Sequence, residues 1–282
     1  MVRILGPFIG LFFALGALWA FANGAIADAP VLAQYGHFTA PTAETVFHKE
    51  PEALRLQSDG PFGTWNKEQL QRGFAVYDNV CKACHSLSHV SFRDLEQIGY
   101  SEAEVKAIAK TYQVPHYNAA TGEVATADGK PTDHFPPVVY AGQGSPPDLS
   151  LITKAREGGA AYVHSLLTGY ADQAGYKNDK GQELLKMFPD IKTPDGLHFN
   201  PYFANLNIAM PPPLTDDAVT YSDGTKATVD QEAQDVAAFL TWTAEPSLVK
   251  RHQVGWAVLG FLLFATVLAY MSKRTIWAEK EH

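Results

Sequence analysis

Residues 81–85 read CKACH, and they contain the only two cysteines of the 282-residue chain. Cysteines separated by two residues occur in zinc sites, in redox-active dithiols and, when a histidine follows directly, at covalent haem attachment sites. Each of these three alternatives requires different surroundings in the rest of the sequence.

A structural zinc ion takes about four protein ligands, so a CxxC pair normally meets a second Cys or His pair. No second cysteine pair exists, and the histidines other than His85 form no HxxxH-type pair. A thioredoxin-like dithiol belongs to a strand-to-helix turn, whereas helical periodicity precedes this motif. Zinc and dithiol chemistry are therefore the weaker interpretations.

Apolar residues recur at three- and four-residue spacing from Asn66 up to the motif, which predicts a helix that delivers the cysteines. Thiols three positions apart on one turn can add to the two vinyl groups of one porphyrin, and the next residue then presents an imidazole to the iron. We expect Cys81 and Cys84 to bind one haem c and His85 to be its proximal ligand.

The sixth iron ligand decides between electron transfer and ligand chemistry, because a methionine there saturates the iron and raises its potential. Of the four methionines, one is the initiator and one lies in an apolar carboxy-terminal run. Met210 is followed by three prolines, which stiffen its loop and remove amide donors. We expect Met210 to be the ligand, with Met187 or a histidine such as His198 as alternatives.

The interval between the two predicted iron ligands contains GSPPDLS (144–150) and TKAREGGAAYVHSLLTGY (153–170). The proline pair that ends at Pro147 offers apolar surface for a porphyrin, although an ordinary loop explains it as well. Arg156 can pair with a haem propionate through a charge-assisted bond. From the residues alone, a surface arginine is the simpler interpretation of Arg156.

Residues 1–27 form an apolar segment whose only charge is Arg3. It ends in Ala-Ile-Ala, which fits a signal peptide cleaved before Asp28, but the run is long enough to be an uncleaved membrane segment. Both alternatives export the chain that follows. The segment lacks the Arg- and Ser-rich amphipathic character of a mitochondrial presequence, which favours a bacterial source.

Residues 254–271 carry no charge and would be about 27 Å long as a helix, which predicts a transmembrane span. Lysine and arginine pairs bracket the run, and interfacial aromatic residues favour a span over a buried core helix. Export then places residues 28–253 in the periplasm and residues 272–282 in the cytoplasm.

Residues 28–253 carry 28 acidic and 18 basic side chains. This excess of acid argues against nucleic acid as a partner and favours a basic protein, unless it serves solubility alone. The segment from Asp216 to Asp235 has six carboxylates and only Lys226 as a base. We expect this segment to be a docking face.

Helical patterns cover 101–112, 160–168, 182–188 and 228–243, with Ser101/Glu104 and Thr228/Gln231 as capping pairs. Loop-rich tracts lie between them, including 115–147 with a predicted turn at 127–130. The fold class is therefore mainly α, with a large loop-rich insertion and a carboxy-terminal transmembrane helix.

Four motifs together carry a resemblance to a known family: RGFAVYDNVCKACHSL, the GSPPDLS to LLTGY tract, HFNPYFANLNIAMPPPL, and DVAAFLTWTAEP before one membrane span. In this combination the chain resembles cytochrome c1, the haem subunit of the cytochrome bc1 complex. The resemblance implies a cytochrome c-type fold in which the helix around Phe74 crosses the 228–243 helix. It also implies His85 and Met210 as axial ligands, Arg156 as propionate partner, and Pro147 and Tyr162 near the ring.

The resemblance further implies an electron carrier, not an enzyme, in the bacterial inner membrane. Electrons would pass from the Rieske iron-sulfur protein to a cytochrome c, with cytochrome b as a further partner in a dimeric complex. A free-standing, membrane-anchored cytochrome c that donates to a terminal oxidase is the alternative. Some bacterial members have an additional cysteine pair that this chain lacks, so the prolines after Met210 and packing must stiffen its loop.

Overall fold

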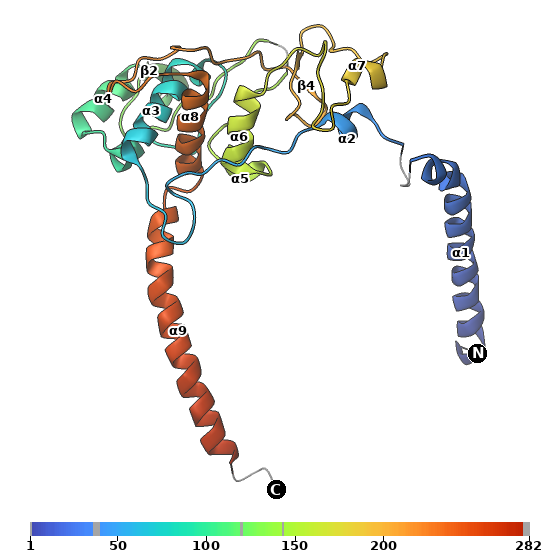
Figure 1. The fold of residues 1–282 in the computed structure, drawn as a ribbon. Helices are drawn as coiled ribbons and strands as arrows, with labels where there is room; N and C mark the ends of the chain where they lie inside the picture. The colour runs from blue at the N-terminus through green and yellow to red at the C-terminus, as the bar shows by residue number, and fades with distance from the viewer. Residues whose placement is uncertain (1, 36–39, 119–120, 143, 279–282) are drawn as a thin grey trace. The chain divides into compact units, whose positions relative to one another are not determined.

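A computed structural model describes residues 2–35, 40–118, 121–142 and 144–278 of the chain. The described residues are mainly helical, with two small antiparallel sheets (Figure 1). The longer helices are α1 (Val2–Tyr35), α3 (Lys67–Asn79), α4 (Glu102–Lys110), α6 (Gly159–Thr168), α8 (Val229–Ala244) and α9 (Leu248–Trp277). The short helices are α2 (Ala43–Phe47), η1 (Cys81–Ala83), η2 (Phe92–Ile98), α5 (Ile152–Ala155) and α7 (Leu184–Met187). The strands are β1 (Gln113–Asn118), β2 (Glu123–Asp128), β3 (His198–Phe199) and β4 (Asn207–Ile208).

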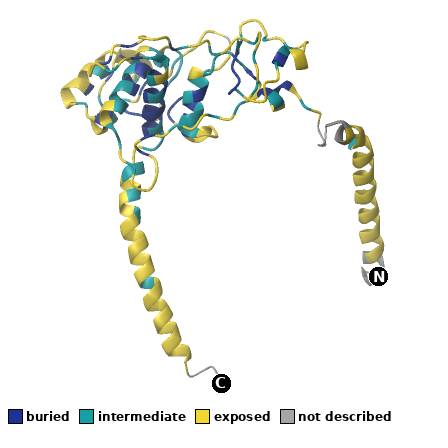
Figure 2. Cartoon of the chain, in the orientation of Figure 1, coloured by how far each residue is buried: buried dark blue, intermediate teal, exposed yellow. Residues whose placement is uncertain are grey.

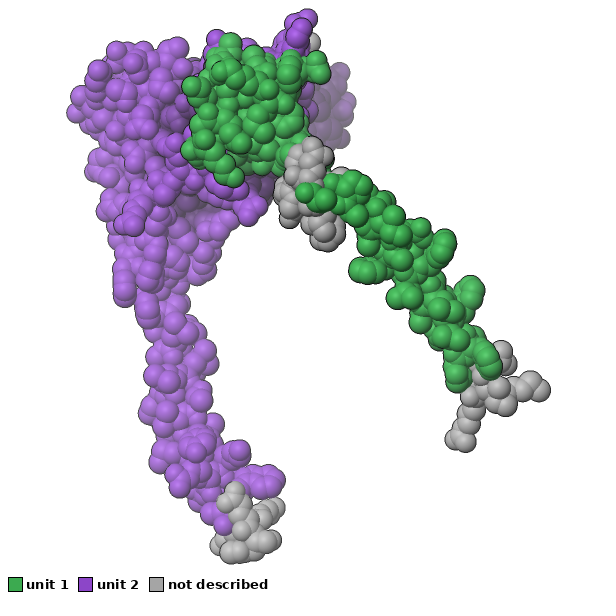
Figure 3. Space-filling view, turned by 45° about the vertical axis from the view of Figure 1, so that its right-hand side comes forward, with its two compact units in different colours: residues 1–48, 173–191 green, residues 49–172, 192–282 purple. Residues whose placement is uncertain are grey.

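The chain divides into two compact units (Figure 3). The first unit comprises residues 1–48 and 173–191 and is built around Phe47, whose ring packs against Tyr176 and Phe188. Its helix α1 runs through the boundary predicted at residue 28 and ends at Tyr35. Cleavage after residue 27 remains a prediction.

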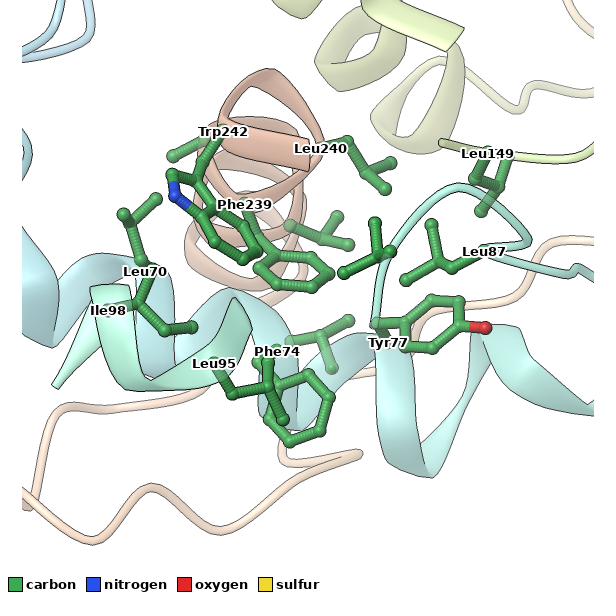
Figure 4. Packing of buried hydrophobic residues seen from close by; sticks show 14 of the residues in the cluster. Leu70, Phe74, Tyr77, Leu87, Leu95, Ile98, Leu149, Phe239, Leu240 and Trp242 are labelled. Atoms are coloured by element: carbon green, nitrogen blue, oxygen red, sulfur yellow. The ribbon is translucent and has the colours of Figure 1, made fainter. Parts of the chain in front are cut away.

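The second unit, residues 49–172 and 192–282, contains the main core, in which α3 packs across α8. Figure 4 shows Leu70, Phe74 and Tyr77 of α3 meeting Phe239 and Trp242 of α8. All five side chains are at least 97% buried. The crossing expected for the helix around Phe74 is therefore confirmed.

Local sequence patterns determined several helix ends. Ser101 and Glu104 form the predicted capping box of α4, and Thr228 accepts a hydrogen bond from the Gln231 amide at the start of α8. The turn predicted at 127–130 is wrong, because these residues follow or end β2. Strands β1 and β2 pair antiparallel, and Gly122, whose φ of 72° favours glycine, lies in a turn directly before β2.

The carboxy-terminal helix α9 leaves its apolar side chains exposed along almost its whole length (Figure 2). Its length and composition suffice to cross a bilayer, and none of its apolar window is buried. The window Pro7–Pro30 of α1 has the same properties. A soluble core helix would bury such a surface, so the exposure of α9 agrees with a membrane anchor.

Candidate functional site

Helix α3 ends at Asn79, and only its C-cap residue Val80 separates it from the CKACH motif. Residues Cys81–Ala83 form one turn of 3₁₀ helix, and the amides of Cys84 and His85 both donate to the Cys81 carbonyl, at 3.1 and 2.9 Å. The predicted helix therefore ends two positions before Cys81, and a tighter helical turn carries the motif. Both thiols are free, and burial raises the pKa of Cys81 to about 12. A neutral thiol argues against a redox-active thiolate.

The His85 imidazole is held by a backbone carbonyl. Its Nδ1 lies 2.7 Å from the Pro147 carbonyl oxygen, and since a carbonyl only accepts, Nδ1 must carry the proton. Nε2 then keeps its lone pair for a metal. Burial lowers the pKa of His85, which favours the neutral imidazole that metals bind.

The segment around Pro147 is itself fixed to the residues that follow the motif. The Leu149 amide donates to the Ser86 carbonyl at 2.9 Å, and the Asp148 carboxylate accepts from the amides of Ser88 and Ser150 at 2.9 and 2.8 Å. Burial alone would raise the pKa of Asp148, but these donors outweigh it and lower the pKa. These hydrogen bonds of the PPDLS motif thus hold the Pro147 carbonyl in position to accept from His85.

Met210 follows the small sheet formed by β3 and β4, two positions after Ile208. The loop between the strands is organised by Asn200, which is fully buried. Its side-chain amide donates to the Leu166 carbonyl on α6 at 2.8 Å, and its backbone amide donates to the Leu206 carbonyl at 2.8 Å. Leu206 is also fully buried and has a left-handed φ of 63°, which non-glycine residues adopt rarely. Asn200 therefore connects α6 to the loop that precedes Met210.

Tyr170 fixes Met210 directly, because its hydroxyl donates to the Met210 carbonyl at 3.0 Å. Burial raises the pKa of Tyr170, so the hydroxyl stays a donor. Sequence reasoning missed both Tyr170 and Asn200. The LLTGY and HFNPYF motifs that contain them were part of the family resemblance, but nothing in their spacing assigns these contacts.

All seven residues predicted for the site line one cavity of about 370 Å³ in the second unit. They come from segments far apart in the sequence: the CKACH turn, the PPDLS loop, the α5–α6 region and the Met210 loop. The wall between them is apolar and includes Val80, Tyr140, Pro146, Leu149, Ile152, Val163, Leu166, Leu167, Phe203, Ile208, Pro211, Pro213, Val236 and Leu240. A cavity of this size lined by apolar groups with a few polar ones is typical of cofactor sites.

The alternative candidates for the sixth iron ligand, His198 and Met187, do not line the cavity. His198, on β3, is not among the residues that line the cavity. Met187 lies on α7 in the first unit, where its side chain is 40% exposed. Among the described residues that line the cavity, Met210 is the sole methionine.

Arg156 and Tyr162 lie together on the cavity wall. Arg156 directly follows α5, and burial raises the pKa of Tyr162 while the positive charge of Arg156 partly offsets that rise. Within the described part of the chain, no carboxylate forms an ion pair with Arg156. An exposed guanidinium at the edge of an apolar cavity has the chemistry to hold an anionic substituent of a bound group.

The donor set of this cavity fits a haem c. Two thiols three positions apart match two vinyl groups, an Nε2 lone pair and a thioether match the iron, and a guanidinium matches a propionate. The apolar walls match the faces of the porphyrin.

The predicted docking segment needs a correction, since two of its six carboxylates are fully buried. Asp235 accepts from Arg72 Nε at 2.8 Å, and Arg72 also binds Asp223 at 2.7 Å. Glu232 accepts from the Val219 amide at 3.2 Å, and burial raises its pKa. These two side chains hold α8 to its neighbours and cannot meet a partner. Asp216, Asp217, Asp223 and Asp230 remain exposed.

Comparison with known proteins gives a consistent result. The Cytochrome C1 family matches residues 56–280. Cytochrome c1 of Rhodospirillum rubrum is 39% identical over 274 residues, covering 91% of this chain and 97% of the relative. Cytochrome c1 of Cereibacter sphaeroides is 37% identical over 265 residues, covering 80% and 87%. A protein of Bradyrhizobium diazoefficiens named cytochrome b/c1 is 39% identical over 246 residues, covering 82% of this chain and 36% of the relative.

Proposed function

This chain belongs to the cytochrome c1 family, and we propose that it carries electrons from the Rieske iron-sulfur protein to a cytochrome c. It is an electron-transfer subunit of the bc1 complex with a covalently bound haem c. The haem supplies a one-electron iron couple, and the protein sets its potential, orientation and docking. We assign no residue an acid, base or nucleophile role, so quinol oxidation belongs to other subunits.

In this proposal Cys81 and Cys84 would hold the haem through thioether bonds, and His85 and Met210 would supply the two protein ligands of its iron. Pro147 fixes the tautomer of His85, because its carbonyl accepts from Nδ1 at 2.7 Å. With both ligands supplied by the protein, the site would be closed to exogenous ligands and suited to electron transfer. Arg156 and Tyr162 would hold a haem propionate.

The membrane arrangement follows from α9. We propose that residues 254–271 span the bacterial inner membrane, with residues 28–253 in the periplasm, residues 272–282 in the cytoplasm and residues 1–27 removed as a signal peptide or retained as a second span. Cytochrome b is the expected neighbour in the membrane, which the name of the Bradyrhizobium relative supports. A dimeric complex remains part of the proposal.

The acceptor docks, in this proposal, on the exposed carboxylates Asp216, Asp217, Asp223 and Asp230. A basic cytochrome c would be steered to them by charge. Glu232 and Asp235 are not part of this surface, because they are fully buried.

The observation that carries the proposal is the convergence of the seven residues on one cavity. Potentiometric titration of Met210→Leu tests its central assignment, with Met187→Leu as the matched control. We expect Met210→Leu to lower the haem potential and to remove the near-infrared sulfur-to-iron band, while Met187→Leu changes neither. An unchanged potential and band in Met210→Leu would exclude Met210 as the ligand.

Mass spectrometry of the protein purified from its membrane tests the remaining parts. We expect one haem bound to the 81–85 peptide, and a cytochrome b and a Rieske protein in the same preparation. The amino-terminal peptide of the mature chain shows whether it begins at Asp28. Purification without a haem b protein would contradict the proposed partners.

A further inference from the structure

The loop of residues 57–64 places an exposed aromatic ring beside the membrane helix. Phe62 stacks on Trp256 of α9 with ring centroids 5.1 Å apart and planes 7° from parallel. The Trp256 indole N–H donates to the Pro61 carbonyl at 3.3 Å. Figure 1 shows this loop beside the start of α9. The contact joins two segments separated by 195 positions.

Phe62 gains little burial from this contact, because 78% of its side chain remains exposed. Pro61 beside it is also exposed. A large apolar side chain exposed to water costs free energy, since about 25 cal/mol is gained per Å² of apolar surface removed from water. The stacking therefore leaves an apolar tip, Pro61 and Phe62, that a further apolar environment would stabilise.

The loop is built to hold this tip in place. Its neck is closed by the Thr64 amide, which donates to the Gln57 carbonyl at 2.9 Å, and by the Gln57 side-chain amide, which donates to the Thr64 hydroxyl at 3.0 Å. A side chain at Gly63 would force the loop backbone to shift, since its Cβ would overlap the Ser58 carbonyl oxygen. The Asp59 carboxylate accepts a hydrogen bond at 2.8 Å from the amide of Leu56, the residue before the loop.

The position of Trp256 along α9 indicates which environment surrounds the Phe62–Trp256 contact. The uncharged run begins at Val254, so Trp256 lies about 3 Å further along the helix axis. Lys250 and Arg251 lie one to two turns before Trp256. This is where tryptophan residues sit in the aromatic belt, between lipid headgroups and hydrocarbon. A side chain stacked on Trp256 reaches the same depth.

We propose that the loop 57–64 is a second membrane contact of the haem domain, with Phe62 inserted beside Trp256 at the lipid interface. The ligand is the lipid bilayer, and the contact restrains the rotation and tilt of the domain on α9. The proposal rests on α9 being the membrane span assigned under the proposed function.

Nitroxide labelling of the full chain in lipid nanodiscs tests this inference. Single cysteines replace Phe62, Val124 on β2, which is 66% exposed, and Leu263 in the middle of α9, which is 69% exposed. Cys81 and Cys84 are consumed by the haem, and the haem spectrum reports that each variant is folded. The measured quantity is the logarithm of the ratio of collision rates with oxygen and with a water-soluble nickel chelate.

We expect this logarithm to be positive at positions 62 and 263 and negative at position 124, which carries the same apolar label. A negative value at 62 with a positive value at 263 overturns the proposal while α9 remains a span. Low collision rates with both reagents at 62 would also overturn it, because they indicate burial against protein. A negative value at 263 would instead contradict the membrane span itself.

Discussion

The Tyr170 hydroxyl donates a 3.0 Å hydrogen bond to the backbone carbonyl of Met210, although the two residues are separated by 40 positions in the sequence. Asn200 fixes the same loop from the other direction, through the Leu166 carbonyl of α6. The loop that presents the proposed thioether ligand is thus held by α6 and the residues after it, not only by its three prolines. These hydrogen bonds stiffen the loop in a chain that has no cysteines beyond those of the CKACH motif.

Tyr170→Phe removes the hydrogen bond and leaves the Met210 carbonyl without this donor. We expect a loss of about 1 kcal/mol of stability and a weaker iron-sulfur bond, measured as a lower haem potential. Tyr117→Phe is the control, because Tyr117 lies on β1 and its side chain is 69% exposed. Equal potentials in the two variants would show that the hydrogen bond does not position the ligand.

Gly73→Ala tests the crossing of α3 and α8. A Cβ at this position would overlap the Asp235 carbonyl and lie 2.6 Å from Phe239 Cβ, so the two helices must move apart. We expect a loss of about 1–3 kcal/mol, read as a lower unfolding midpoint in denaturant. Gly224→Ala is unsuitable as a control, since its φ of 77° would strain any side chain. Ala75→Ser, elsewhere on the same helix, controls for substitution on α3 itself.

Glu232→Gln tests the buried carboxyl of α8. Burial raises the pKa of Glu232 above its ordinary value, so its protonated form is the one that suits the folded state. The contribution of Glu232 to the stability of the fold is present below the unfolded pKa near 4.5. It is lost as pH rises through the folded pKa. We expect the variant to unfold at a higher temperature than the wild type at pH 8, and the difference to vanish near pH 4. Destabilisation of equal size at both pH values would contradict this.

Asp216→Asn with Asp217→Asn tests the corrected docking surface. Both residues are exposed, so removing their charge should lower the rate of electron transfer to a basic cytochrome c several-fold at low ionic strength. The difference should disappear in high salt, because screening removes the steering. Glu232→Gln is the matched control, because it alters a buried carboxyl group of the same segment. A rate that is independent of salt in the wild type would refute electrostatic docking.

The sequence determined the features that depend on neighbours along the chain. The CKACH spacing identified the cofactor chemistry, the Ser101/Glu104 and Thr228/Gln231 pairs located helix starts, and the uncharged run at 254–271 predicted the membrane helix. These inferences succeed because a capping hydrogen bond, a helical turn and a bilayer-length apolar run each involve consecutive residues. Counting the methionines limited the candidates for the sixth iron ligand to a few side chains.

The tertiary structure decided what depends on segments that approach each other through space. The Pro147 carbonyl sets the tautomer of His85 from 62 positions away, and Arg72 takes Asp235 out of the docking surface from 163 positions away. Composition does not distinguish a buried carboxylate from an exposed one. The burial of Glu232 and Asp235 depends on the packing of α8 against α3, which only the folded chain shows. Hydrogen bonding and desolvation act over a few ångströms, and only the folded chain fixes which distant groups come that close.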